Sequence, residues 1–253
     1  MADATAWVGA VRNSHDRLTA LLDSLDTARL TGPSYASEWT IAQVASHLGS
    51  QAEIFGLFLD AGLVGAAPPG GEAFGPIWDH WNALPPQQQA GESIRANEAF
   101  VDRLERAAAA DDGFRLSMFG RDVDLAGLAA LRLGEHAVHT WDVAVALDPT
   151  ATVADDAVGL LVDTLAPIAA RATPIEGVGS MAIRITGPDR SFRLNLHPEV
   201  SLTEVTAPQP DPLYLPAEAF VRLVYGRLDP GHTPADAGDD PRLPVLRSVF
   251  PGF

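Results

Sequence analysis

The sequence predicts an α+β protein of 253 residues, in which a four-helix bundle (residues 1–149) precedes a small α/β domain (residues 150–253). Two observations lead to this fold class. Apolar residues in the first part recur with the period of about 3.6 residues that is typical of amphipathic helices. In the second part, two short segments alternate apolar and polar residues, as half-buried strands do. The chain is long enough for two domains with a sizeable core.

Four helices are expected in the first part. Apolar spacing over residues 7–25 predicts the first. The second begins at Thr40, where Gln43 three residues later completes a capping-box pattern. Residues 86–110 form the third helix, which ends before a run of Asp and Gly. The fourth covers residues 124–148 and ends there because a proline follows.

The second part mixes helices and strands. A helix, bent at a proline, is predicted over residues 153–168, and a β-hairpin over residues 181–196. A further strand covers residues 201–205. A helix then begins at Pro216, a residue that is common in the first turn, and ends near Arg227. These elements predict a small domain with one sheet.

Composition excludes several classes of protein. The formal net charge of −16 opposes binding to nucleic acid or to an anionic membrane surface, since both require clustered Lys and Arg. The absence of Cys excludes disulfides, thiolate metal sites and a cysteine nucleophile. The chain has no apolar run of membrane-spanning length, and its first residues lack the pattern of a signal peptide. We therefore expect a cytoplasmic protein.

The fourth helix carries an unusual group of polar residues. Glu135, His139 and Asp142 share one stripe with apolar residues, whereas His136 is expected to point outward. The second helix likewise has His47 on its apolar face. Buried charged groups need partners or a metal. Two imidazoles and one carboxylate on facing helices of a bundle could form a three-ligand site for a divalent cation.

The same residues permit simpler interpretations. Glu135 and His139 could form a buried ion pair, and His47 could be a hydrogen-bonded core histidine. Asp142 could either orient a metal ligand or take part in an ion pair within its helix. The spacing by itself leaves these alternatives open.

Two motifs resemble a known family. Residues 38–48, EWTIAQVASHL, resemble the signature W-T-(V/I)-x-(D/Q)-(V/L)-x-x-H-L of the DinB-like, mycothiol-dependent maleylpyruvate isomerase family. Residues 135–144, EHAVHTWDVA, resemble its second signature, E-x-x-x-H-x-W-D. The second half of the chain, with its hairpin and the helix end at residues 225–227, resembles the sterol-carrier-like C-terminal domain of that family.

The resemblance implies a divalent metal, usually zinc, bound by His47, Glu135 and His139. It also implies mycothiol as the thiol cosubstrate of a protein that has no thiol of its own. A basic pair in the last predicted helix, Arg222 and Arg227, could bind an anionic substrate. The expected partners are thus a small-molecule electrophile and a low-molecular-weight thiol, bound by a monomer or a homodimer.

The predicted function is that of a zinc-dependent enzyme in which the thiol attacks the electrophile. The product would be either a cis–trans isomer or a thiol adduct, which makes the enzyme an isomerase or an S-transferase. Two alternatives differ in kind: a metal-dependent hydrolase that acts through metal-bound hydroxide, and a binding module without catalysis. Metal content and thiol dependence distinguish the three.

Overall fold

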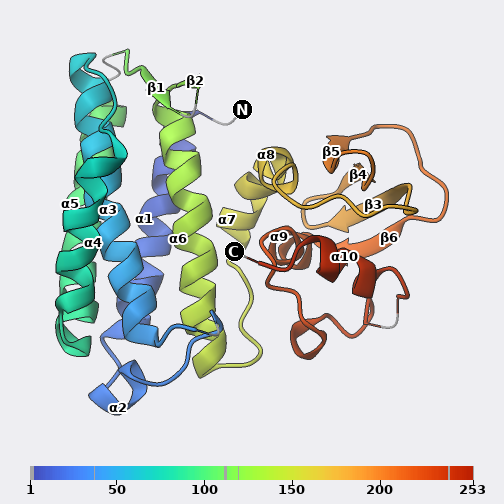
Figure 1. The fold of residues 1–253 in the computed structure, drawn as a ribbon, viewed down its shortest axis with the longest axis horizontal. Coiled ribbons are helices and arrows are strands. Elements are labelled where there is room, and N and C mark those ends of the chain that lie inside the picture. The colour runs from blue at the N-terminus through green and yellow to red at the C-terminus, as the bar shows by residue number, and fades with distance from the viewer. Residues whose placement is uncertain (1–2, 37, 111–112, 119, 239, 253) are drawn as a thin grey trace. The chain divides into compact units, whose positions relative to one another are not determined.

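The computed structural model describes residues 3–36, 38–110, 113–118, 120–238 and 240–252. The chain divides into two compact units, residues 1–151 and 152–253. The first unit is mainly helical and the second contains a four-stranded sheet (Figure 1). The predicted α+β fold class is therefore confirmed.

Long helices form the first unit and lie side by side in Figure 1. They are α1 (Ala4–Leu22), α3 (Ile41–Val64), α5 (Pro86–Ala110) and α6 (Leu125–Leu147). Side chains cap three of their first turns: Asp3 for α1, Thr40 for α3 and Asp124 for α6. In α3 the Gln43 side chain also accepts from the Thr40 backbone N–H, which completes the predicted capping box. The four predicted helices are thus present, with ends close to those predicted.

The apolar stripes of these helices meet in a common core. Leu18 of α1, Val44 and Leu48 of α3 and Val143 of α6 are completely buried there. Burying a side chain of this size contributes about 1.5–3 kcal/mol. This packing helps to hold α3 beside α6.

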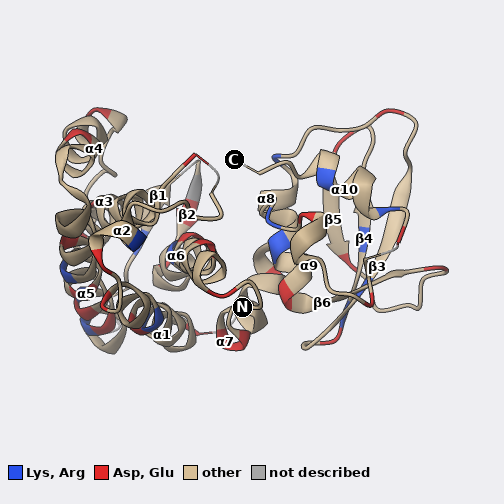
Figure 2. Cartoon of the chain, turned by 90° about the horizontal axis from the view of Figure 1, so that it is seen from below, with Lys and Arg blue, Asp and Glu red and all other residues tan. Residues whose placement is uncertain are grey.

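Charged side chains join the outer faces of α1 and α5, where residues of both signs are visible in Figure 2. Arg12 of α1 donates to three carboxylates of α5: Glu98 at 2.8 Å, Asp102 at 2.6 Å and Glu105 at 2.9 Å. Exposed ion pairs of this kind are worth about 0.2–1 kcal/mol each, because water and salt screen them. They therefore add little to the stability of the unit.

Five short elements of the first unit were not predicted from the sequence. They are α2 (Thr27–Leu30), η1 (Gly71–Ala73), α4 (Phe74–Ala83), β1 (Leu116–Met118) and β2 (Arg121–Val123). The position of α4 depends on Trp81, whose Nε1 donates to Glu53 Oε1 at 2.9 Å. The Trp81 ring packs directly on Gly49 of α3. Such contacts join residues that are far apart in the sequence, so no local sequence pattern predicts them.

The variant Gly49→Ala is expected to destabilise the protein by about 1–3 kcal/mol, the usual cost of overpacking. An added Cβ would lie 2.2 Å from the Trp81 ring, which is far inside contact distance. Gly9→Ala is the matched control, because nothing surrounds its Cβ position in α1 and alanine favours the helix. Thermal and urea denaturation measure both variants. Equal stability of the two would show that Trp81 does not pack on Gly49 as described.

The sheet of the second unit has the strand order β5-β4-β3-β6. Strand β3 (Ser180–Thr186) pairs antiparallel with β4 (Arg190–Asn195), with Ile183 opposite Phe192. Strand β5 (Ser201–Glu204) continues the antiparallel order. The predicted hairpin and third strand are therefore present. Strand β6 (Leu213–Pro216), which pairs parallel with β3, was not predicted.

Helices cover this unit in short pieces. They are α7 (Asp155–Leu161), η2 (Val162–Thr164), α8 (Ala166–Ala169), α9 (Ala217–Val224), η3 (Pro230–His232) and α10 (Leu243–Val249). The first three replace the single bent helix predicted over residues 153–168, and Pro167 lies in the first turn of α8. On α9, Phe220 packs against Phe192 of the sheet, with ring centroids 5.3 Å apart. None of the helices among the described residues is long and apolar enough to cross a membrane.

Candidate metal centre

Three predicted ligands come together in the first unit. His47 projects from α3, and Glu135 and His139 project from consecutive turns of α6. Glu135 Oε2 lies 3.5 Å from His47 Nε2 and 3.9 Å from His139 Nε2. One potential ligand atom from each residue lies within 4.8 Å of the others, and the described part of the chain contains no other group of three donors this close.

Helix geometry explains this convergence. Residues four apart lie on one face of a helix, so Glu135 and His139 present their side chains together. The packing of α3 beside α6 then brings His47 opposite them. The three side chains are 25 %, 40 % and 11 % exposed for His47, Glu135 and His139. The group is therefore partly exposed to solvent, mainly through Glu135.

The two imidazoles are arranged to offer a nitrogen. His139 Nδ1 lies 2.8 Å from Oδ2 of Asp142, a fully buried carboxylate, which leaves Nε2 facing Glu135. His47 Nε2 is buried without a hydrogen-bond partner among the described residues, and its 3.5 Å separation from the Glu135 carboxylate is long for such a bond. Burial lowers the pKa of His47, although the nearby Glu135 carboxylate acts to raise it. The lowered pKa favours a neutral imidazole.

The carboxylate is held ionised. Burial acts to raise the pKa of Glu135, but the two neighbouring imidazoles and the amide of Gln51 outweigh burial and lower that pKa to about 2. Gln51 Nε2 donates to Glu135 Oε2 at 2.7 Å. An ionised carboxylate beside two imidazole nitrogens, one of them with no hydrogen-bond partner, is the donor set that first-row divalent cations take. These residues therefore fit a divalent cation.

An aromatic side chain borders the group. The Trp39 ring centroid lies 5.0 Å from that of His47 and 6.0 Å from that of His139, on which it stacks. Trp39 is 36 % exposed, so one part of its ring remains available to a ligand. Trp39 directly precedes the helix cap at Thr40, and the two rings it contacts come from different helices.

One orientation predicted on α6 was wrong. His136 was expected to point outward, but it is fully buried, and its Nδ1 lies 2.9 Å from the Ser14 hydroxyl of α1. Burial, together with the charge of Arg132, lowers the pKa of His136 well below its usual value. The error arises because α1 covers the side of α6 that the apolar pattern leaves open. His136 lies apart from the three-donor group.

The predicted substrate-binding arginines belong to the second unit. Arg222 is 3 % exposed, and its guanidinium pairs with both oxygens of Glu218, at 2.7 and 2.8 Å. It also donates to the His232 carbonyl oxygen at 2.8 Å. Arg227 is 7 % exposed and donates to the Tyr225 carbonyl oxygen at 2.7 Å. These contacts organise the end of α9, so each arginine has a structural role within its own unit.

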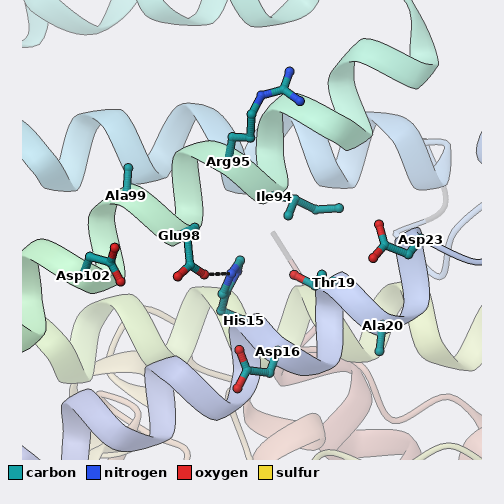
Figure 3. Close-up of a pocket in the computed structure, with 10 residues that line it drawn as sticks. All are labelled: His15, Asp16, Thr19, Ala20, Asp23, Ile94, Arg95, Glu98, Ala99 and Asp102. Carbon is teal, nitrogen blue, oxygen red and sulfur yellow. Dashed lines mark hydrogen bonds and ion pairs between the residues drawn. The ribbon is translucent and has the colours of Figure 1, made fainter.

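A hollow lies between α1 and α5 (Figure 3). His15 Nε2 pairs there with Glu98 Oε2 at 2.6 Å, and Asp16 and Asp102 also line the hollow. His15 is only 2 % exposed. Glu98 and Asp102 also bind the Arg12 guanidinium, so these carboxylates already have a cationic partner within the protein.

A known protein family matches most of the first unit. The family described as "Mycothiol maleylpyruvate isomerase N-terminal domain" matches residues 11–144, more than half of the chain and all three candidate ligands. No curated protein matches the chain by sequence.

Two crystal structures are similar over nearly the whole chain. One is of the mycothiol-dependent maleylpyruvate isomerase, at 17 % identity and a TM-score of 0.64. The other is of a histidine-to-alanine mutant of an enzyme with that name, at 16 % identity and a TM-score of 0.65. Each similarity covers 90 % of this chain and 92 % of the other. At this identity the structures show a shared fold. The family match, which spans α3 and α6 with both motifs, shows that the chain belongs to the mycothiol maleylpyruvate isomerase N-terminal domain family.

Proposed function

We propose that this protein is a metal-dependent enzyme in which a low-molecular-weight thiol, mycothiol, attacks an electrophilic small molecule. It would act as a cis–trans isomerase of the maleylpyruvate type or as an S-transferase. The observation that carries the proposal is the convergence of His47, Glu135 and His139 in a chain of this family. The Glu135 carboxylate is ionised, and His47 Nε2 has no hydrogen-bond partner among the described residues. The absence of Cys supports an external thiol.

The metal would be held by the imidazoles of His47 and His139 and the carboxylate of Glu135, with zinc preferred by the family resemblance. A divalent cation in such a site deprotonates a thiol that coordinates it. Three protein ligands leave room for a further donor, as in catalytic rather than structural metal sites. The exposure of Glu135 gives that donor a route from solvent.

Asp142 is a positioning residue in this proposal. Its buried carboxylate would hold the proton of His139 on Nδ1, at 2.8 Å, so that the lone pair of Nε2 faces the ligand group. Trp39 would cover one side of both imidazoles and limit the access of water. Neither residue needs to bind the metal itself.

The substrate is proposed to be a small anionic electrophile. An isomerase would form and then break a carbon–sulfur bond with the thiol, and change only the geometry of a double bond, whereas an S-transferase would retain that bond. The sequence-based prediction that Arg222 or Arg227 binds the substrate carboxylate stays a prediction. Arg222 already has a carboxylate partner in Glu218.

Metal analysis tests the central step. Protein purified without a histidine tag is expected to contain, or to take up after reconstitution, one equivalent of divalent metal per chain. Elemental analysis after removal of free metal measures this ratio. A value well below one equivalent with zinc, cobalt, manganese and nickel alike would favour the binding-module alternative, in which Glu135 and His139 form an ion pair.

A further inference from the structure

Two polar residues lie behind the carboxylate of the candidate metal centre. Gln51 of α3 donates from Nε2 to Glu135 Oε2 at 2.7 Å. Arg132 of α6 donates from Nη1 to Gln51 Oε1 at 2.7 Å. The three side chains form a chain of hydrogen bonds in which Gln51 is the link. The oxygen that accepts from Gln51 is also the one that lies closest to both imidazoles.

This chain of hydrogen bonds has a fixed direction. A glutamine amide has a donor end and an acceptor end, which can exchange places by rotation, whereas a guanidinium can only donate. Arg132 therefore requires the amide oxygen of Gln51 to face it. The NH₂ group of Gln51 must then face Glu135, where it can only donate to the carboxylate.

The guanidinium itself is held firmly. Arg132 is fully buried, and its Nη2 donates to the Leu48 carbonyl oxygen at 2.9 Å and to Asn97 Oδ1. Its Cζ lies 5.6 Å from the ring centroid of Phe55 and 6.0 Å from that of Phe100, within the range of cation–π attraction. A buried cation is costly unless it is paired or hydrogen-bonded. Three hydrogen bonds from Nη1 and Nη2 hold this guanidinium in place, whereas Nε is buried without a partner among the described residues.

We propose that Arg132 acts through Gln51 as a positioning pair that holds the Glu135 carboxylate toward the two imidazoles and raises the affinity of the site for a divalent cation. This inference rests on the proposed metal centre. It adds to that centre two residues that belong to neither sequence motif.

The sign of the effect separates positioning from simple electrostatics. A guanidinium close to a cation site repels the bound cation. If Arg132 acted only through its charge, removing that charge would strengthen metal binding. If it acts through Gln51, removing it frees the amide to rotate and weakens metal binding.

The test measures the dissociation constant of Co²⁺ by titration of its visible absorption, on Gln51→Met, Arg132→Met, the double variant and the wild-type protein. Loss of a group that orients a metal ligand weakens binding by about 10- to 100-fold, and we expect Gln51→Met to do so with an altered absorption spectrum. Because Arg132 acts through Gln51, the double variant should bind no more weakly than Gln51→Met alone.

Gln89→Met is the matched control. Gln89 is a buried glutamine of α5 that donates to the Trp81 carbonyl oxygen, so its loss should lower stability and leave the affinity for Co²⁺ within about twofold. Circular dichroism checks the fold of every variant. If Arg132→Met does not fold, Gln51→Met decides the question, because Gln51 is only half-buried.

Wild-type affinity in Gln51→Met, tighter Co²⁺ binding by Arg132→Met, or additive losses in the double variant would each overturn the positioning pair and leave the metal centre intact. Absence of Co²⁺ binding by the wild-type protein would instead overturn the metal centre, and this inference with it.

Discussion

His139→Ala is expected to lose bound divalent metal and catalytic turnover while the protein remains folded. His139 supplies one of the three donor atoms. Loss of a group that only orients a metal ligand weakens metal binding by up to about 100-fold, so loss of the ligand itself should weaken it more. The apolar core, built around Leu18, Val44, Leu48 and Val143, does not include this imidazole. Helix content should therefore be unchanged.

A moderate loss of thermal stability should accompany this change. A ligand that is present at 100 times its dissociation constant stabilises the native state by about 2.7 kcal/mol, and the variant would no longer receive this contribution. Metal-free wild-type protein and His139→Ala should consequently melt at similar temperatures.

His80→Ala is the matched control, since His80 is exposed on α4 and outside the three-donor group. It should retain metal and activity. Elemental analysis, calorimetric titration with Zn²⁺ and circular dichroism give the readouts. A His139→Ala protein with full metal occupancy and wild-type turnover would show that the assignment of ligands is wrong.

Turnover of an electrophilic substrate is expected to require an added thiol and to saturate with its concentration. The chain has no Cys, so it cannot supply the sulfur nucleophile itself. Without thiol, activity should fall to the level of the uncatalysed reaction. The assay uses metal-loaded protein with an activated alkene that bears a carboxylate, with and without mycothiol.

The pH dependence of this reaction should be shallow near neutrality. A free thiol with a pKa of about 8.5 is mostly protonated at pH 7, and its reactivity rises steeply with pH. Coordination to a metal removes that dependence, because the sulfur is then already deprotonated. A rate that instead rises about tenfold per pH unit between pH 6 and 8 would contradict metal coordination of the thiol.

The hydrolase alternative predicts a different result. An enzyme that acts through metal-bound hydroxide would cleave an activated ester in the absence of any thiol. Metal-loaded wild-type protein, assayed with such an ester, distinguishes the two reactions, and His139→Ala serves as the background. Thiol-independent hydrolysis that His139→Ala abolishes would replace the thiol mechanism with the hydrolytic one.

Local signals determined most of the fold. The capping box of Thr40 and Gln43 sets the start of α3, and the proline after Asp148 limits α6. The alternation over β3 and β4 predicts their hairpin. Each signal acts between residues close in sequence, so it can be recognised without the tertiary structure. The short element α4 has no such signal, since it is held in place by contact between Trp81 and Gly49.

The candidate metal centre was predictable in part for the same reason. The spacing of Glu135 and His139 places both on one face of α6, and their motif resembles that of the family. The position of His47 opposite them follows from the packing of α3 on α6, which the apolar stripes of the two helices suggest but do not specify. Resemblance to the family predicted that His47 lies beside Glu135 and His139. In the structure His47 Nε2 lies 3.5 Å from Glu135 Oε2.

The sequence predicted the four long helices, the α+β class and the family, and the resemblance to that family pointed to the three candidate ligands. Only the tertiary structure decided which neighbours surround α6. His136 is buried because α1 covers its side of α6. Arg132 is connected to Glu135 through Gln51 because α3, which carries Gln51, packs against α6. Periodicity reports how apolar residues are distributed around one helix. It does not report how many helices pack around it, and in this bundle that number decides which polar groups are buried and connected.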